Sequence, residues 1–106
     1  DVILCSEYCE LGDLEALATA PLSERHVVVL LRVVAQTLVY LYEREILHRD
    51  VKSENVLLSS DGTGRLCDFG LAARCPKGTY LRDQWGTPGF SAPEVKTGQY
   101  DLRADV

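Results

Sequence analysis

The chain has 106 residues, of which 46% are hydrophobic and 25% charged, and its formal net charge is -5 at pH 7. These values are typical of one small globular domain and exclude a disordered or fibrous chain. The acidic balance argues against a nucleic-acid partner, which would need a clustered basic face on the protein. The longest apolar run, Val27 to Leu31, is far shorter than a bilayer span, so we expect no membrane insertion.

The first part of the chain predicts a strand and then a short helix. The run Val2 to Leu4 is apolar and rich in β-forming residues, and Gly12 breaks the pattern further on, so a strand leading into a connector is expected. Asp13 suits the first turn of a helix over residues 13–20, because its carboxylate complements the helix dipole. Pro21 should end this helix.

A longer helix is predicted to begin after Ser23, whose hydroxyl can cap it, and to end near residues 43–45. Apolar residues recur in it at steps of three and four, which indicates one broad apolar face. Additional valines widen that face, so we expect burial on several sides. The face comprises Val27, Leu30, Leu31, Val34, Leu38, Leu41 and Tyr42, widened by Val28, Val29, Val33 and Val39.

A hairpin is predicted after the long helix. Two β-like runs, residues 56–59 and 65–67, flank the turn-forming residues 60–64. Gly62 and Gly64 might instead begin a phosphate-binding glycine motif. That alternative is disfavoured because Cys67 stands where the third glycine is required and no helix follows.

The cysteines are four in number and form no C-x-x-C pair, and their spacings match no common zinc site. Free thiols in a reducing compartment are therefore favoured over a disulfide or metal framework. We expect an intracellular, cytoplasmic protein, with a nuclear location still open. The chain begins at Asp1 without Met, which suggests a fragment of a longer protein. The cysteines are Cys5, Cys9, Cys67 and Cys75.

Three polar patterns occur in a fixed order around the hairpin. His48 to Asn55 reads His-Arg-Asp-Val-Lys-Ser-Glu-Asn and fits H-R-D-x-x-x-x-N. Asp68-Phe69-Gly70 follows the hairpin, and Ala92-Pro93-Glu94 comes later. In this order the patterns resemble the middle of the protein kinase catalytic domain, and the resemblance covers the whole chain.

The resemblance implies a fold of the α+β class, a partial protein-kinase-like fold. Residues 1–11 match the last strand of the amino-terminal lobe and the hinge. Residues 12–106 match the first half of the mainly helical carboxy-terminal lobe, with an activation segment over residues 68–94. The chain contains neither the family's glycine-rich loop nor its strand lysine, so we expect residues 1–106 alone to be inactive.

Phosphoryl transfer needs positioning and charge neutralisation more than covalent catalysis. On the resemblance, Asp50 accepts the proton of the acceptor hydroxyl, and Lys52 neutralises charge on the transferred phosphate. Asn55 and Asp68 would hold Mg²⁺, since a hard cation prefers oxygen ligands. ATP is the implied cofactor, with its adenine edge on the backbone of Glu7 and Cys9, its ribose near Asp13, and Leu57 below the ring.

Lys52 in the loop and Gly86-Thr87-Pro88 before Ala92-Pro93-Glu94 are similar to serine/threonine kinases rather than tyrosine kinases. The resemblance implies that Thr87 bonds to Asp50 and Lys52 and shapes the acceptor site. The expected partner is a protein or peptide with a Ser or Thr acceptor.

Arg49 suggests regulation through the activation segment, because an arginine there can bind a phosphate and order the loop. Thr79 and Tyr80 are candidate phosphorylation sites by residue type. Many family members carry a regulatory phosphothreonine four residues before the position of Thr87, where this chain has Asp83. Its carboxylate would partly imitate a phosphate, although a solvated loop aspartate explains the residue equally well.

Asp105 resembles a buried aspartate of the family that bonds back to the backbone of the catalytic loop. Three interpretations of the whole chain stay open. The first is a segment of an active serine/threonine kinase, which the presence of Asp50, Asn55 and Asp68 together favours. The second is a kinase-like scaffold or binding module without the amino-terminal lobe, and the third is a truncated product without function.

Overall fold

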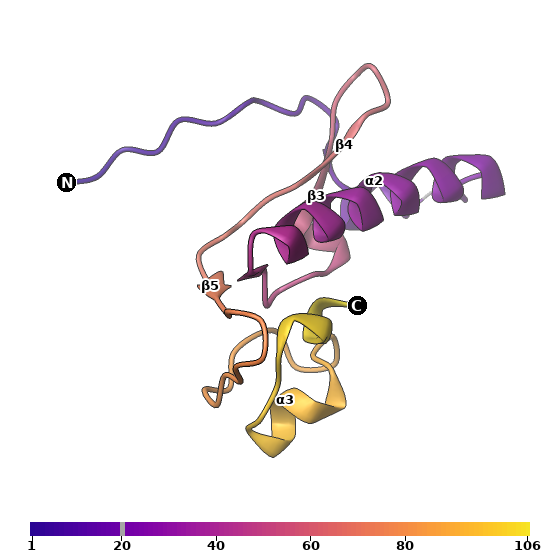
Figure 1. Ribbon diagram of the computed structural model, residues 1–106. Coiled ribbons are helices and arrows are strands. Elements are labelled where there is room, and N and C mark those ends of the chain that lie inside the picture. Colours follow the sequence, from indigo (N-terminus) through magenta and orange to yellow (C-terminus); the bar gives the residue numbers. More distant parts are fainter. Residues whose placement is uncertain (20) are drawn as a thin grey trace.

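The computed structural model describes residues 1–19 and 21–106. It contains a three-stranded antiparallel sheet in the order β1-β3-β4, and a two-stranded antiparallel pair, β2-β5. The long helix α2 lies beside both, and α3 lies at the opposite end of the molecule from the β3–β4 turn (Figure 1). The elements are β1 Gly12–Asp13, α1 Leu14–Leu17, α2 Glu24–Glu43, β2 Ile46–Leu47, η1 Ser53–Asn55, β3 Val56–Leu58, β4 Gly64–Leu66, β5 Ala73–Arg74, α3 Pro93–Thr97 and η2 Leu102–Asp105.

The predicted hairpin is confirmed as β3 and β4, with Val56 opposite Leu66. Gly62 has a φ of 81°, a left-handed conformation that glycine adopts without strain, so it can make the turn. A β-carbon added to Gly64 would lie 3.5 Å from Leu30, which shows how closely α2 packs on β4. The hairpin also brings the segment after β4 to the end of residues 48–55, where the backbone N–H of Cys67 donates to the carbonyl of Asn55 at 2.8 Å.

The predicted strand at Val2 to Leu4 is wrong. The first eight residues run as an extended, exposed arm that points away from the body (Figure 1). An isolated extended segment becomes a strand only when a neighbour accepts and donates its backbone hydrogen bonds, and no described strand lies beside this one. As a result, Val2, Ile3 and Leu4 are 90%, 86% and 91% exposed.

Both predicted helix starts are confirmed. The Asp13 side chain accepts a hydrogen bond from the backbone N–H of Ala16 at 2.7 Å, and Ser23 caps α2 through the backbone N–H of His26. The predicted end of the first helix is wrong, because α1 stops at Leu17, well before Pro21. Position 20, within the predicted helix, lies outside the described residues.

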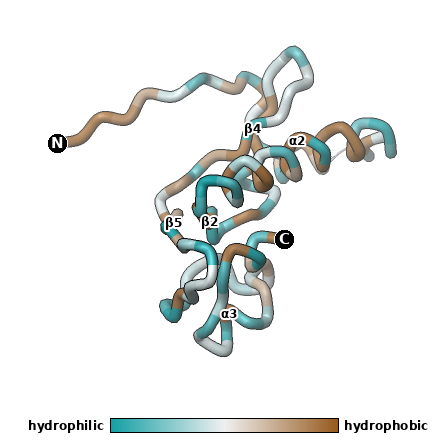
Figure 2. The backbone as a smooth tube through the Cα atoms, in the orientation of Figure 1, coloured by the Kyte–Doolittle hydropathy of each residue, from teal (hydrophilic) through white to brown (hydrophobic). Residues whose placement is uncertain are grey.

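The long helix α2 is less buried than its sequence predicts. Only Leu30 and Leu41 are buried in it. Hydrophobic residues recur along the helix (Figure 2), and several of them, such as Val28, Leu31 and Val39, are exposed. By length and composition α2 is apolar enough to cross a membrane, a property that the short apolar run did not reveal. Because α2 packs on β4 and β2 along one side, the same composition also suits a helix that packs against protein.

The small core lies below α2, where β2 meets the end of the chain. Its members are fully or almost fully buried, and Leu81, Ala92 and Ala104 pack around them. The core residues are Leu47, Cys75, Val95, Tyr100 and Leu102.

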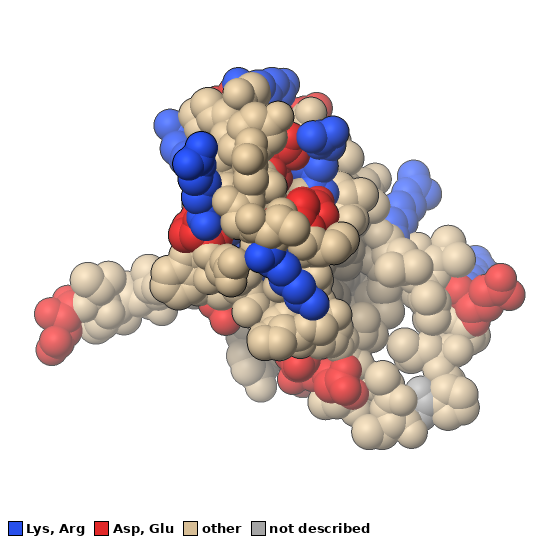
Figure 3. Space-filling model, turned by 90° about the horizontal axis from the view of Figure 1, so that it is seen from below, with Lys and Arg blue, Asp and Glu red and all other residues tan. Residues whose placement is uncertain are grey.

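The surface carries both signs of charge. On the face seen from below, Lys and Arg side chains are interspersed with acidic and uncharged residues (Figure 3).

Candidate active site

The catalytic loop, residues 48–55, begins directly after β2 and is held by a distant carboxylate. Arg49 has a φ of 70°, a conformation that costs a non-glycine residue about 1–3 kcal/mol unless its surroundings enforce it. Asp105 accepts hydrogen bonds from the backbone N–H groups of His48 at 2.6 Å and Arg49 at 2.9 Å. These contacts agree with the role that the resemblance implied for Asp105, and they fix the turn that presents Asp50.

His48 connects the loop to the segment after β4. Its side chain is fully buried, and Nδ1 accepts the backbone N–H of Asp50 at 3.2 Å. Nε2 must therefore carry the proton of the neutral ring, and it donates to the carbonyl of Cys67 at 2.8 Å. The ring also contacts Phe69 edge-on, with the ring centroids 4.8 Å apart. Sequence analysis gave His48 no role, although its place at the start of the H-R-D pattern was a signal.

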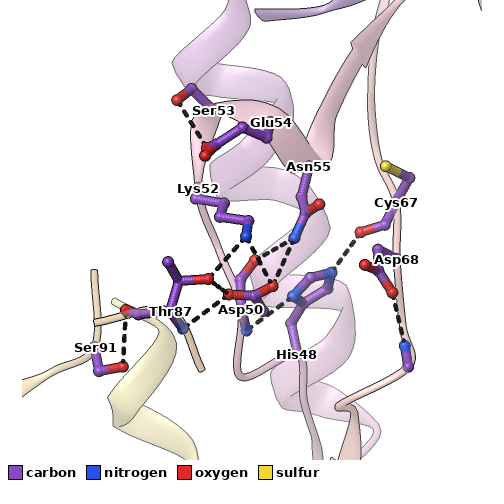
Figure 4. Close-up of polar contacts among 11 residues, drawn as sticks. His48, Asp50, Lys52, Ser53, Glu54, Asn55, Cys67, Asp68, Thr87 and Ser91 are labelled. Atoms are coloured by element: carbon purple, nitrogen blue, oxygen red, sulfur yellow. Dashed lines mark hydrogen bonds and ion pairs between the residues drawn. The ribbon is translucent and has the colours of Figure 1, made fainter. Parts of the chain in front are cut away.

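Asp50, Lys52 and Thr87 form one polar cluster, as predicted (Figure 4). One carboxylate oxygen of Asp50 accepts the hydroxyl of Thr87 at 2.6 Å and the backbone N–H of Thr87 at 3.1 Å. Lys52 Nζ lies 2.8 Å from the Thr87 hydroxyl and 3.4 Å from the other carboxylate oxygen of Asp50. The predicted activation segment is thus bonded directly to the carboxylate of Asp50.

Asn55 is the third side chain bonded to Asp50, and together Thr87, Lys52 and Asn55 form a cage around its carboxylate. Its amide nitrogen donates to the carbonyl of Asp50 at 2.7 Å and to the carboxylate at 3.1 Å. Burial alone would raise the pKa of Asp50, but hydrogen bonds from Thr87, Lys52 and Asn55 together lower it below its ordinary value. The carboxylate is therefore ionised at neutral pH, the state that accepts a hydrogen bond from an acceptor hydroxyl.

The approach of the activation segment to the loop depends on Gly86. Its φ is 109°, and an added β-carbon would lie 2.6 Å from the backbone oxygen of Arg49. Every larger residue would meet this backbone atom, which cannot rotate away as a side chain can. Gly86 therefore permits the next residue, Thr87, to reach Asp50.

The two predicted metal ligands lie on neighbouring segments. Asn55 is buried, and no described residue donates a hydrogen bond to its amide oxygen. Every fully buried polar side-chain atom of the described chain has a partner, so the amide oxygen of Asn55 must be in contact with solvent. Asp68 is exposed at a φ of 59°, and one of its carboxylate oxygens accepts from the backbone N–H of Gly70 at 3.2 Å. Both side chains thus keep an oxygen available, and the donor set fits Mg²⁺.

The predicted nucleotide-binding residues lie along the β1-β3-β4 sheet. Asp13 pairs with Leu57 across β1 and β3, so these two are brought together. Cys9 is buried, with the Ser59 hydroxyl 3.6 Å from its sulfur, whereas Glu7 is exposed on the arm. One carboxylate oxygen of Asp13 is already used to cap α1. The sheet therefore brings Asp13 and Leu57 together, whereas Glu7 lies on the arm outside the sheet.

The candidate regulatory residues are only partly brought together. Arg49 Nη1 lies 2.7 Å from the Asp83 carboxylate, as expected if Asp83 takes the place of a phosphate. Thr79 and Tyr80 are exposed, and no hydrogen bond or ion pair joins either side chain to Arg49 within the described residues. Tyr100, which the sequence analysis missed, contacts both Arg49 and Asp83.

Comparison with known proteins places this site in a family. The protein kinase domain matches the chain over residues 1–106. The chain belongs to the protein kinase family. Serine/threonine-protein kinase hippo of Drosophila melanogaster is 38% identical over the whole chain, which covers 17% of that relative. Serine/threonine-protein kinase cst-1 of Caenorhabditis elegans is 37% identical, with the whole chain covering 22% of it.

A third kinase relative carries a different name. The putative tyrosine-protein kinase C03B1.5 of Caenorhabditis elegans is 35% identical over 99% of the chain, which covers 33% of that relative. The chain thus spans about a fifth of the length of the first two relatives and a third of this one. Family membership and the partial kinase-like α+β fold are established by these matches, whereas the acceptor residue requires a separate argument.

Proposed function

We propose that the protein containing this chain transfers the terminal phosphoryl group of ATP to Ser or Thr side chains of protein substrates. The observation that carries the proposal is the cage around Asp50, whose carboxylate accepts the Thr87 hydroxyl at 2.6 Å and lies 3.4 Å from Lys52. An inactive scaffold has no chemical need for a buried, ionised carboxylate held by three donors.

In this proposal Asp50 aligns the acceptor hydroxyl and receives its proton. Because the pKa of Asp50 is lowered, the carboxylate is a weak base, and the proton moves late, when the oxygen has begun to bond to phosphorus. The ammonium group of Lys52 lies beside Asp50 and Thr87, where it would stabilise negative charge on the transferred group. Positioning and electrostatics then account for most of the rate.

The nucleotide would lie between the catalytic loop and the sheet. Asn55 and Asp68 would hold Mg²⁺, which neutralises phosphate charge when bound. Leu57 and Asp13 lie side by side across β3 and β1, which suits contact with the base and the ribose. The backbone of Glu7 and Cys9 would bind the adenine edge.

Two observations favour Ser or Thr over Tyr as the acceptor. Lys52 bonds to Thr87 beside Asp50, and this lysine and threonine are the residues that make the chain similar to serine/threonine kinases. The hippo and cst-1 relatives are named serine/threonine kinases, although C03B1.5 is named a putative tyrosine kinase. We also infer an intracellular location, where ATP is available and free thiols such as those of this chain persist.

The test uses the purified full-length protein with labelled ATP, Mg²⁺ and a mixture of Ser, Thr and Tyr peptides. Phosphoserine or phosphothreonine is expected, and Asp50→Asn should lower kcat by about 10²–10⁴-fold while nucleotide binding persists. Asp61→Asn, at an exposed turn aspartate, is the matched control and should behave as wild type. Phosphotyrosine alone, or equal rates for wild type and Asp50→Asn, would contradict the proposal.

A further inference from the structure

The side chain of Arg49 joins three parts of the chain at one point. It leaves the catalytic loop next to Asp50 and is only 11% exposed. Nε donates to the carbonyl of Leu71 at the start of the activation segment, and Nη1 donates to Asp83 in its middle at 2.7 Å. A third contact, 3.3 Å long, joins Nη1 to the hydroxyl of Tyr100.

The mostly buried charge of Arg49 requires an anion nearby, and Asp83 supplies it. The hydrogen bond from Arg49 lowers the pKa of the Asp83 carboxyl, so the carboxylate is charged at neutral pH. Trp85 adds a weaker contact, because the guanidinium lies 5.9 Å from the centre of its ring. Arg49 is thus already neutralised by a residue of the segment itself.

Tyr100 fixes the backbone that carries Asp83. Its side chain is almost fully buried, and its hydroxyl donates to the backbone carbonyl of Asp83 at 2.6 Å while accepting from Arg49. Its own backbone pairs with Leu81 through two hydrogen bonds of 2.8 and 3.1 Å. The turn at Asp83 is therefore held from two sides, and its carboxylate is aimed at Arg49.

We propose that Asp83 and Tyr100 are positioning residues, which hold the activation segment against the catalytic loop without a phosphate on that segment. The inference rests on the proposed kinase function and adds its mode of regulation. Thr87, which contacts Asp50 directly, lies four residues beyond Asp83 on the same segment, so fixing Asp83 limits the movement of Thr87. Ordering by a carboxylate is permanent, whereas ordering by a phosphate is reversible.

The first test compares kcat/KM of the full-length protein before and after treatment with a protein phosphatase. The two values should agree within about twofold, since the anion belongs to the chain. Asp83→Asn keeps the size of the side chain but removes its charge, and should lower kcat/KM about tenfold, mainly through kcat. Asp83→Glu restores the charge and should recover most of the loss, which a merely structural role would not require.

A second pair of variants tests Tyr100. Tyr100→Phe keeps the buried ring and removes the hydroxyl, and should lower kcat/KM about fivefold. Tyr40→Phe, at an exposed tyrosine of α2, is the matched control and should equal wild type. A loss of activity on phosphatase treatment, or full activity of Asp83→Asn and Tyr100→Phe, would overturn the inference.

Hydrogen exchange separates this inference from the proposed function, because it does not depend on catalysis. Amides of residues 81–90 should exchange at least threefold faster in Asp83→Asn than in wild type, with little change in β3 and β4. Equal exchange in this segment would overturn the inference even if the protein is an active kinase. A wild-type protein that transfers no phosphate, yet shows the faster exchange in Asp83→Asn, would contradict only the proposed function.

Discussion

The catalytic loop and the outer face of α2 belong to one small chain but differ in the surroundings of their side chains. In the loop, Asp50, Asn55 and His48 are buried, and each is hydrogen-bonded. The outer face of α2 carries large apolar side chains that meet solvent: Val28, Leu31 and Val39 are 58%, 62% and 58% exposed. The buried polar side chains of the loop therefore find their partners within the described residues, whereas the exposed apolar side chains of α2 find no matching partner there.

This difference indicates that the geometry of the loop depends more on a few long-range polar contacts, and on the close approach of Gly86 to the backbone of Arg49, than on a large core. Asp105 and Thr87 lie far from the loop in sequence, and both bond to it directly. A change at such a contact should disturb the site, whereas a change on the outer face of α2 should not. The predictions below test this contrast, in order of decreasing effect.

Gly86→Ala should have the largest effect. The added β-carbon would lie 2.6 Å from the backbone oxygen of Arg49, and φ at this position is 109°. We expect a loss of about 2–4 kcal/mol in the free energy of unfolding, together with a fall in kcat of about a hundredfold, because Thr87 is displaced. Urea denaturation and steady-state kinetics of the full-length protein measure both.

Gly89→Ala is the matched control for Gly86→Ala. Its φ is 96°, but an added β-carbon meets no atom within 4 Å. It should cost about 1 kcal/mol, from backbone strain alone. Equal losses for the two variants would mean that strain, and not the close approach to the loop, explains the requirement for glycine at position 86.

Leu30→Ala and Leu31→Ala compare a buried and an exposed leucine at neighbouring positions of α2. Leu30 is 8% exposed and packs near Gly64 of β4, whereas Leu31 is 62% exposed. Leu30→Ala should lower the free energy of unfolding by about 2 kcal/mol, and Leu31→Ala by less than about 0.5 kcal/mol. Equal losses in the full-length protein would show that another segment of that protein covers the outer face.

Asp105→Asn should have a smaller but specific effect. Its carboxylate accepts from two backbone N–H groups, those of His48 and Arg49, and an amide offers only one oxygen. One donor is left without a partner, so we expect a loss of about 1–2 kcal/mol in stability and a fall in kcat. Asp61→Asn, which keeps an acceptor in an exposed turn, should change neither quantity.

The sequence predicted the elements that are fixed by local chemistry. Ser23 and Asp13 cap helices, and residues 60–64 form a turn, because each needs only its near neighbours. The membership of the catalytic cluster was also predictable, since the spacing of Asp50, Lys52 and Thr87 is characteristic of a known family.

Features that depend on distant partners were not predictable. Val2 to Leu4 has the composition of a strand, but a strand requires a neighbour that composition does not supply. The periodicity of α2 showed an apolar face and not whether anything covers it. Tyr100 carries no local signal for its contact with Arg49, because that contact depends on the path of the whole activation segment.

The pH dependence of stability provides the smallest effect. Hydrogen bonds lower the pKa of Asp50 despite its burial, so the native state holds its carboxylate ionised more strongly than the unfolded state does. A lowered pKa contributes stability that is fully present above the unfolded value, about 3.9, and is lost as pH falls through the native value. The stability due to this carboxylate should therefore be constant between about pH 5 and 7 and decrease below about pH 4.

The measurement is the free energy of unfolding of wild type and Asp50→Asn from pH 2.5 to 7. The Asp83 carboxyl, whose pKa Arg49 also lowers, titrates in both proteins, so its contribution cancels in the difference. The free energy of unfolding of wild type minus that of Asp50→Asn should be constant from neutral pH to about pH 5. At lower pH this difference should decrease, because Asp50 of the wild type becomes protonated. A difference that changes between pH 5 and 7 would mean that the native pKa of Asp50 is raised. Burial would then raise the pKa of Asp50 by more than the hydrogen bonds from Thr87, Lys52 and Asn55 lower it.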